Sequence, residues 1–494
     1  MSASIDTRSL EPANGSLRPA DFTPRERVVE ALRSMRCSDA VPELSEMARG
    51  SSCLLAFVLA QVGIVLALST PDPLTLYTSP TTLNASDTVL AGLPVLPGVS
   101  HIQVHSGSGS GRTYAHHAIT EYIDSTLYVA WSSGMIDEDQ MGQQSWIAKG
   151  TKASNGTWTF TSPRVVFSSA LLSNQTAEQN YTYWCSNDIT QRGSQPNAFV
   201  KFKSSVYAVI EAVDITCYNS GGSKYTQLVL DRAPMEEHQV PNALCANPLR
   251  TKLTTLLNRP DIQPMTNEKL INVGTYLASD GVHSLQEVTH AVWFDDGTNT
   301  GKGYWQRFWR DTSSVSSNSL VTWTEFSTSV DGSDWFPAVV QSGTNKIVKT
   351  NIPDSNTKTF YGAVTLSSGP ATFLVHNPQY YADTRWRQPL SISVAHDRIH
   401  FNTDHVIRTN ASQSFVADTR GVKRVGLSYP HATVAEDEII VAYSEDKENI
   451  WITRIPLSSL ASNTTTSSTT TSSSTSTSSS SLTTPSLGTG YSRT

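Results

Sequence analysis

The sequence predicts an all-β fold, and three observations support this prediction. Short runs of alternating apolar and polar residues, bounded by Gly, Asn, Asp and Ser, recur from about residue 75 to residue 457. A helical pattern is nearly absent outside residues 246–258. Polar turns that end in an aromatic residue, such as Ser154-Asn-Gly-Thr-Trp158, repeat between the runs. This repetition is typical of a β-propeller, and blades of roughly 45 to 55 residues predict seven of them, with six or eight possible.

The expected strands follow one another as hairpins. Successive side chains of a strand point to opposite faces, so an alternating run buries one face and exposes the other. Most of the runs are separated by a short polar turn, as neighbouring antiparallel strands require. On these grounds we expect strands at residues 117–122, 126–131, 197–202, 205–211, 225–230, 289–294, 371–375, 438–443 and 449–454.

Composition and charge exclude one class of partner. The chain has 494 residues, with 36 Lys and Arg against 43 Asp and Glu, and a formal charge of -7. Nucleic-acid binding needs a basic stripe, and the basic residues do not cluster into one, so no nucleic-acid partner is expected. Hydrophobic residues make up 38% of the chain, which is enough to bury a large core.

The N-terminal region carries a targeting signal. Residues 53–68 form an apolar run that is short for a bilayer span of about 20 residues and fits the hydrophobic part of a secretory signal. We expect a signal peptide or signal anchor at residues 47–67, with cleavage after Ala67, and an upstream extension at residues 1–46. Translation from Met1 or from Met47 stays open. The protein is expected to be secreted and monomeric, with no stable membrane contact once the signal is removed.

The C-terminal region has almost no apolar side chain to bury. Residues 464–481 are all Ser or Thr, so residues 458–494 are expected to form a disordered tail and residues 75–457 the propeller. Three cysteines follow the signal, which leaves their pairing open. No CxxC or HExxH spacing occurs, so no metal site or cofactor is predicted, although calcium is not excluded.

The first candidate site is the pair His116 and His117, where the first full blade is expected to begin. Because neighbouring strand residues face opposite sides, at most one of the two rings is expected to point into a given cavity. In the structural alternative, one imidazole is buried in hydrogen bonds and the other lies between blades. An imidazole is suited to proton transfer near neutral pH.

Further candidates lie in expected loops and strand ends. Arg192 stands beside a glycine and could clamp a carboxylate in a bidentate manner, or form a salt bridge between blades. Polar and aromatic residues gather in several other segments, where turn chemistry alone also favours them. These candidates are Tyr183, Asn377, Arg387, Tyr429, His431 and Lys447.

Several of these motifs resemble a known family. Tyr114-Ala-His116-His117-Ala118, Asn377-Pro378, Arg387-x-Pro389-Leu390, Tyr429-Pro-His431 and Tyr443-Ser-x-x-Lys447 are similar to motifs of sialidase-like propellers that act on rhamnosyl-glucuronate caps of arabinogalactan and gum arabic. That family includes secreted fungal L-rhamnose-α-1,4-D-glucuronate lyases and bacterial α-L-rhamnosidases. The resemblance implies a secreted polysaccharide lyase whose partner is a plant cell-wall or gum polysaccharide.

The resemblance also implies roles for the candidates. Arg192, or else Arg387, would face the uronate carboxylate, where charge develops during elimination. His116 or His117 would be the base, and Tyr183 or His431 an acid or positioning group. The residues expected to bind the substrate are Arg387, Asn377, Tyr429 and Lys447.

Two alternatives use the same propeller. A hydrolase would need two paired carboxylates, for which Glu121, Asp137, Glu138 and Asp139 are available. The other alternative is a noncatalytic carbohydrate-binding propeller. A true sialidase is disfavoured, because it needs three arginines, a tyrosine with its glutamate and an opening Arg-Ile-Pro motif, whereas Arg454-Ile-Pro456 closes the last blade.

Overall fold

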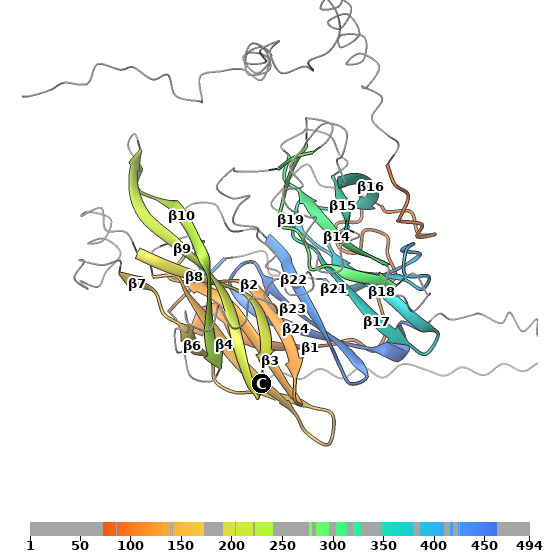
Figure 1. Cartoon of the computed structure of the whole chain (residues 1–494), viewed down its shortest axis with the longest axis horizontal. Helices are drawn as coiled ribbons and strands as arrows, with labels where there is room; N and C mark the ends of the chain where they lie inside the picture. Colours follow the sequence, from red (N-terminus) through yellow and green to blue (C-terminus); the bar gives the residue numbers. More distant parts are fainter. Residues whose placement is uncertain are drawn as a thin grey trace, which may run out of the picture. The chain divides into compact units, whose positions relative to one another are not determined.

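Strands make up nearly all of the regular structure in the computed structural model (Figure 1). The exceptions among the described residues are two short 3-10 turns, Gly107–Gly109 and Leu457–Ser459. The described residues lie within one compact unit, Pro71–Thr494. They are residues 73–461 without 85, 110, 139, 141, 172–190, 203, 221–222, 241–275, 279–282, 296–302, 314–319, 328–346, 379–385, 410–414, 418–422 and 424. The prediction of an all-β protein is confirmed.

The strands form five sheets within these residues, and neighbouring strands pair antiparallel except β19, which pairs parallel with β22. Their orders are β2-β3-β4-β5 with β6 on β4, β7-β8-β9-β10, β11-β12-β14-β15-β16 with β13 on β14, β17-β18-β20-β21, and β1-β24-β23-β22-β19. The bounds are β1 Ser100–Ser106, β2 Tyr114–Ile123, β3 Thr126–Gly134, β4 Gln144–Lys152, β5 Trp158–Phe160, β6 Arg164–Phe167, β7 Ala170–Leu171, β8 Gln191–Phe202, β9 Ser205–Ser220, β10 Ser223–Val240, β11 Tyr276–Leu277, β12 Ser284–Gln286, β13 Val292–Asp295, β14 Gly303–Asp311, β15 Val321–Ser327, β16 Ile347–Pro353, β17 Phe360–Leu366, β18 Gly369–His376, β19 Trp386–Arg387, β20 Leu390–Ala395, β21 Thr403–Arg408, β22 Val425–Ala435, β23 Glu438–Glu445 and β24 Asn449–Pro456.

Each predicted strand lies within an observed one, with one exception, and some observed strands are longer than predicted, such as β9 and β10. The run expected at residues 289–294 becomes a strand only at Val292. The Thr289 hydroxyl accepts a hydrogen bond from the Phe308 backbone amide at 3.0 Å, in place of a backbone carbonyl. The Thr289 amide still donates to the Phe308 carbonyl oxygen at 2.8 Å, but the side chain replaces the Thr289 carbonyl as acceptor. Regular backbone pairing begins three residues later.

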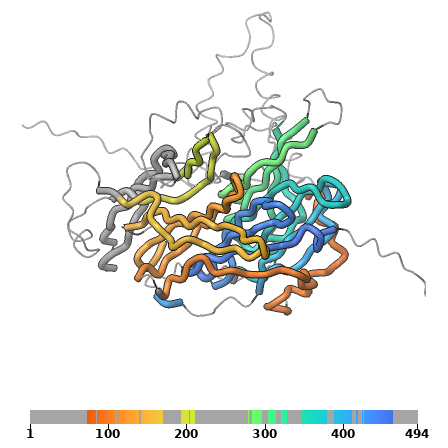
Figure 2. The backbone as a smooth tube through the Cα atoms, turned by 90° about the horizontal axis from the view of Figure 1, so that it is seen from below, coloured from red at the N-terminus to blue at the C-terminus, as the bar shows by residue number. Residues whose placement is uncertain are grey.

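The first and last strands of the propeller pair with each other. β1 runs antiparallel to β24, with Ser100 opposite Arg454, so an early strand (orange) and the last strand (blue) of the chain share one sheet (Figure 2). This pairing places Arg454-Ile-Pro456 inside the closing strand, as the sequence predicts. This pairing covers the edge of β24, and β1 becomes the edge strand of that sheet.

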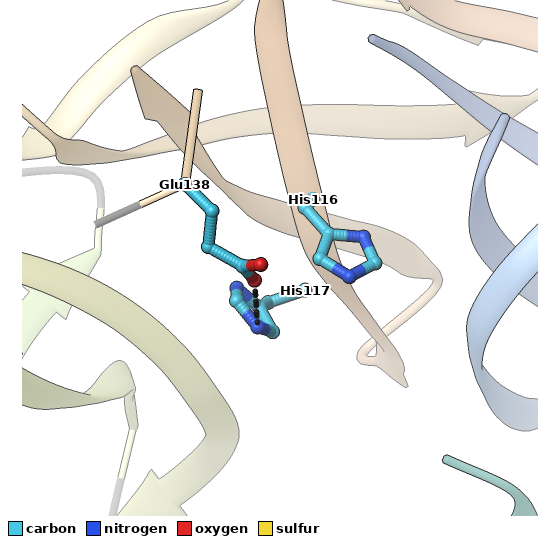
Figure 3. A group of neighbouring side chains, drawn as sticks. All are labelled: His116, His117 and Glu138. Atoms are coloured by element: carbon cyan, nitrogen blue, oxygen red, sulfur yellow. Dashed lines mark ion pairs between the residues drawn. The ribbon is translucent and has the colours of Figure 1, made fainter. Parts of the chain in front are cut away.

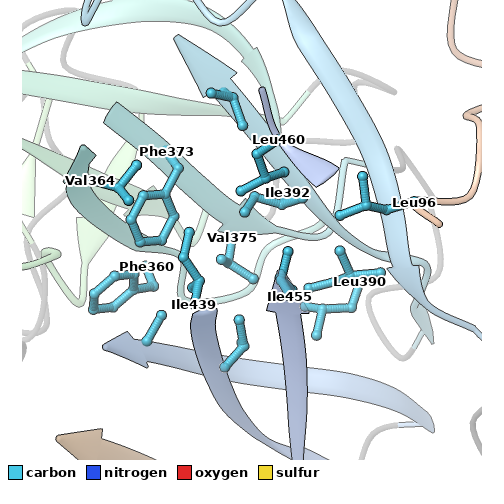
Figure 4. Packing of buried hydrophobic residues seen from close by; sticks show 14 of the residues in the cluster. Leu96, Phe360, Val364, Phe373, Val375, Leu390, Ile392, Ile439, Ile455 and Leu460 are labelled. Carbon is cyan, nitrogen blue, oxygen red and sulfur yellow. The ribbon is translucent and has the colours of Figure 1, made fainter. Parts of the chain in front are cut away.

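The largest core cluster lies between two neighbouring sheets. Phe373 and Ile392 from one sheet pack with Ile439 and Ile455 from the other (Figure 4), and all four side chains are buried. These are the apolar positions of alternating runs, so their burial follows from the period of two. Burying such a side chain contributes about 1.5 to 3 kcal/mol.

The first long strands of different sheets contact one another, and this positions the site. β2 packs against β8 and β22, β22 packs against β17, and β17 packs against β13. Residues at the starts of these strands therefore come together although they are far apart in the sequence. Among the described residues, no helix is both long enough and apolar enough to span a membrane. The predicted signal segment and the predicted tail beyond residue 461 lie outside the described residues.

Candidate functional site

His116 and His117 both face the same region, and the expectation that only one could do so is wrong. Their ring centroids are 4.5 Å apart (Figure 3). The register between β2 and β3 shifts between His116 and Ile119, and His117 has a left-handed backbone with φ of 52°. Alternation of side chains holds only in a regular strand, and this β-bulge turns the second ring back beside the first.

His117 is linked to a carboxylate and a lysine. Its Nε2 lies 3.3 Å from Glu138 Oε1, and Lys447 Nζ lies 2.5 Å from Glu138 Oε2. Burial lowers the pKa of His117 to about 3 although Glu138 opposes the shift, so the imidazole is neutral near pH 7. Burial would raise the pKa of Glu138, but Lys447 and His117 outweigh burial and hold it below its ordinary value.

Tyr429 stands at the centre of the cluster. Its Oη donates to Glu287 Oε1 at 2.5 Å and accepts from Arg310 Nη1 at 2.8 Å. The His116 and His117 rings lie 4.2 and 5.2 Å from the tyrosine ring. Burial raises the pKa of Tyr429, so the phenol is protonated in the unliganded site. Burial opposes ionisation of Glu287, but Arg310 and Lys358 lower the pKa of its carboxyl to about 2.

Four residues of this cluster share an unusual backbone. Each has a φ between 50° and 60°, in the left-handed region that non-glycine residues rarely adopt. Such conformations cost about 1 to 3 kcal/mol each and persist only where the surrounding structure enforces them, which is characteristic of functional sites. The four are His117, Glu287, Tyr429 and Lys447.

Positive charge exceeds negative charge around Tyr429. The Arg387 guanidinium carbon and Lys358 Nζ lie 5.3 and 5.5 Å from the centre of its ring. Arg387 is 4% exposed, and its Nε and Nη1 have no hydrogen-bond partner among the described residues. Burial lowers the pKa of Arg387 to about 10, so the group is still charged at neutral pH. A buried, unpaired charge is unfavourable, and an anionic ligand would relieve that cost.

A glycine allows Arg387 to occupy its position. Gly426 pairs with Arg387 across the parallel strands β19 and β22, and a Cβ on Gly426 would lie 2.2 Å from the Arg387 carbonyl oxygen. We expect Gly426→Ala to lower the free energy of unfolding by roughly 1 to 3 kcal/mol, measured by urea denaturation. Gly156→Ala is the matched control, because Gly156 also has a positive φ but nothing within 4 Å of the added atom. Equal losses in both variants would contradict the steric explanation.

The same side chains offer a possible metal donor set. Donor atoms of His116, His117 and Glu138 lie within 4.8 Å of one another. Imidazole and carboxylate are ordinary ligands of zinc. However, the Lys447 ammonium already pairs with Glu138, and three further cationic side chains face the cluster. Repulsion from these groups makes the arrangement better suited to an anion than to a divalent cation.

The remaining predicted residues are placed elsewhere or not described. Asn377 donates its two amide hydrogens to the carbonyl oxygens of Pro389 and Leu427, at 2.9 and 3.0 Å. His431 contacts Phe360 and lies further along β22 than Tyr429. The Arg192 backbone lies in β8, and its side chain is outside the described part of the structure. Tyr183 is also outside it, so the roles predicted for these two residues stay predictions.

Three residues of the cluster were missed by the sequence analysis, namely Glu287, Arg310 and Lys358. Glu287 is 142 positions from Tyr429, with which it forms a hydrogen bond, so no local motif signals the pair. The sialidase alternative was disfavoured partly because no tyrosine with its glutamate was recognised, and the structure contains such a pair. For Lys358 the sequence offered a weak indication, because it lies in a polar segment between β16 and β17.

The buried carboxyl of Asp354 is expected to make the stability of the protein depend on pH. It is fully buried, and burial raises its pKa to about 7 although Arg310 opposes the shift. Because the folded state retains this proton between the unfolded pKa of 3.8 and about 7, the contribution of Asp354 to stability is lost as pH rises through that window. We expect Asp354→Asn to gain stability relative to the wild type between pH 4 and pH 7, measured by thermal unfolding. A difference that is independent of pH would contradict this assignment.

Comparison with known proteins establishes the fold but no family. No family model and no curated protein matches the sequence. A solved sialidase matches with a TM-score of 0.50 and 16% identity, covering 78% of this chain and 35% of that one. The Trypanosoma rangeli sialidase in complex with the inhibitor DANA has a TM-score of 0.34 and 9% identity, covering 73% of this chain and 60% of that one. A glycosyl hydrolase from Bacteroides ovatus has a TM-score of 0.33 and 10% identity, covering 76% of this chain and 93% of that one.

The chain therefore spans about a third of the first sialidase and three fifths of the second. At these identities the likeness concerns the fold alone. The chain has the sialidase-like β-propeller fold, as predicted. The number of blades and the resemblance to rhamnosyl-glucuronate enzymes stay predictions.

Proposed function

We propose that the protein is a secreted glycosidase that cleaves the glycoside of an acidic sugar. The observation that carries the proposal is the hydrogen bond of 2.5 Å between Tyr429 and Glu287, next to the open guanidinium of Arg387. The sugar carboxylate would accept from Arg387 in a charge-assisted bidentate contact. Lys358 and Arg310 would add to the attraction, because both lie within 6 Å of the same tyrosine ring.

The tyrosine is suited to attack on such a sugar. Tyr429 Oη would form a bond to the anomeric carbon while Glu287 takes the phenolic proton and the glycosidic oxygen departs. A neutral phenol approaches a sugar acid without the repulsion that a carboxylate nucleophile would meet. Water would then cleave the glycosyl-tyrosine bond, and Glu287 would return the proton to the phenolate oxygen.

In its protonated form, His117 would donate the second proton to the departing oxygen, and in the second step it would accept a proton from the attacking water. In the unliganded site burial is the main cause that keeps its pKa low, and Lys358 and Lys447 add to it. A bound carboxylate would offset the charge of these two lysines and raise the pKa of His117 toward its ordinary value. Glu138, 3.3 Å from His117 Nε2, would stabilise the imidazolium form.

Elimination is the second candidate, and one observation favours it. Two neutral imidazoles lie within about 5 Å of Tyr429, and a lyase acting on rhamnosyl-glucuronate needs a neutral base. One histidine would remove the proton at C5 of the uronate, the C4–O bond would break, and Tyr429 would donate its proton to the departing rhamnose oxygen. Arg387 would stabilise the negative charge on the carboxylate. Elimination gives Glu287 no role, although Glu287 accepts the hydrogen bond of Tyr429, and hydrolysis is therefore the first candidate.

Digestion of rhamnosylated arabinogalactan in ¹⁸O-labelled water tests both candidates. Hydrolysis places one labelled oxygen on the anomeric carbon of the released sugar and leaves the ultraviolet absorbance unchanged. Elimination creates an unsaturated uronate, which absorbs in the ultraviolet, and incorporates no label into the products. Binding without release of any product from acidic glycans would contradict both and favour the noncatalytic alternative.

A further inference from the structure

A cavity of about 440 Å³ lies further along the same strands that carry the site. In four segments that meet here, a residue of the Tyr429 cluster comes first and a residue of the cavity wall follows two to four positions later. Because strands rise about 3.3 Å per residue, the cavity is displaced from the cluster along the strand direction. The four pairs are His117 and Glu121, Glu287 and His290, Lys358 and Phe360, and Tyr429 and His431.

The cavity opens at the end remote from the cluster. Val434 and Ala363, the last wall residues on β22 and β17, are exposed, and Val434 is 38% exposed. His431 and Phe360, the first wall residues on the same strands, are buried. A ligand would therefore enter from the side away from Tyr429, and this cavity is distinct from the site described above.

His431 lines the cavity and carries a buried hydrogen-bond donor. The Thr120 backbone amide donates to His431 Nδ1 at 3.3 Å, so the ring proton of the neutral imidazole must be on Nε2. His431 is 3% exposed, and its Nε2 has no hydrogen-bond partner among the described residues. A buried donor without an acceptor is costly. A ligand oxygen in the cavity would satisfy it.

Acceptor and stacking groups complete the wall. The Glu121 carboxylate accepts a hydrogen bond from Thr433 Oγ1 at 3.1 Å, which fixes its orientation at the wall. Trp293 and Trp305 meet edge to face, with ring centroids 5.1 Å apart, and both line the cavity. Tryptophan rings pack against the C–H faces of sugars, and a carboxylate accepts hydrogen bonds from their hydroxyl groups.

We propose that this cavity binds a neutral pyranose. Its volume accommodates a sugar ring, since small-molecule sites have about 300 to 1,000 Å³. The Glu121 carboxylate disfavours an anionic sugar at this wall, whereas the cations around Tyr429, namely Arg310, Lys358 and Arg387, attract one. The proposal does not depend on the chemistry at Tyr429. It makes the protein a binder of two sugar classes, an acidic unit at the cluster and a neutral unit at the cavity.

Isothermal titration of the full chain with D-galactose and L-rhamnose tests the proposal, with D-glucuronate as the anionic comparison. At least one neutral sugar is expected to bind, and Glu121→Gln is expected to weaken that binding about tenfold or more. Glu436→Gln is the matched control, because Glu436 is an exposed glutamate that pairs with Lys152. Trp305→Leu gives a second variant and is expected to weaken binding as well.

The outcomes separate this cavity from the first site. Arg387→Ala is expected to retain binding of the neutral sugar, because Arg387 does not line the cavity. Loss of that binding in Arg387→Ala together with its retention in Glu121→Gln would overturn the proposal, as would failure of both neutral sugars to bind. A further titration uses arabinogalactan from which the uronates have been removed. Tighter binding of this polymer than of the free monosaccharides would show that the cavity binds a sugar unit of a polysaccharide.

Discussion

Tyr429→Phe is expected to reduce turnover of an acidic glycoside by roughly 10³-fold or more while the protein stays folded. The substitution removes the phenolic oxygen, which lies 2.5 Å from Glu287 Oε1 and 2.8 Å from Arg310 Nη1. The ring itself, with its contacts to His116 and Arg387, is retained. Initial rates on rhamnosylated arabinogalactan, with the circular dichroism spectrum as a check of folding, measure the effect.

A matched control distinguishes catalysis from a general loss of structure. Tyr443 also has a buried hydroxyl, which lies 3.0 Å from Thr453 Oγ1 inside one sheet. Tyr443→Phe is expected to cost about 1 kcal/mol of stability and little activity. Should Tyr429→Phe retain more than a tenth of the wild-type rate, the tyrosine would be a positioning group and the proposed nucleophile would be wrong.

Much of the fold could be predicted from local patterns. Alternation in β2, β3, β23 and β24 depends only on which residues are buried, and the hairpins follow because their turns are short and polar. The closing strand could also be recognised, since its apolar stripe is complete. The number of blades could not, because repeats without identical residues leave their boundaries undefined.

The candidate site was only partly predictable, for two physical reasons. His117 and Tyr429 were singled out, yet their directions depend on positive φ values and on bulges in β2 and β22, which alternation does not reveal. Glu287 was not recognised, because it lies just after β12 and its hydrogen bond reaches Tyr429 on β22, a strand of another sheet. Arg387 was predicted as the second choice for the carboxylate, and its unpaired nitrogens support that role.

Arg387→Lys is expected to lower the turnover of acidic glycosides roughly 10²- to 10³-fold, because one ammonium cannot supply the two parallel donors of a guanidinium. The loss should be confined to anionic ligands, so the affinity for glucuronate falls while unfolding in urea changes little. Arg398→Lys is the matched control, since Arg398 stacks on Phe294, 4.6 Å from the ring centre, and is not part of the Tyr429 cluster. If both variants bind glucuronate equally well, the buried charge of Arg387 serves the packing of Tyr429, and the carboxylate must be bound by Arg310 and Lys358.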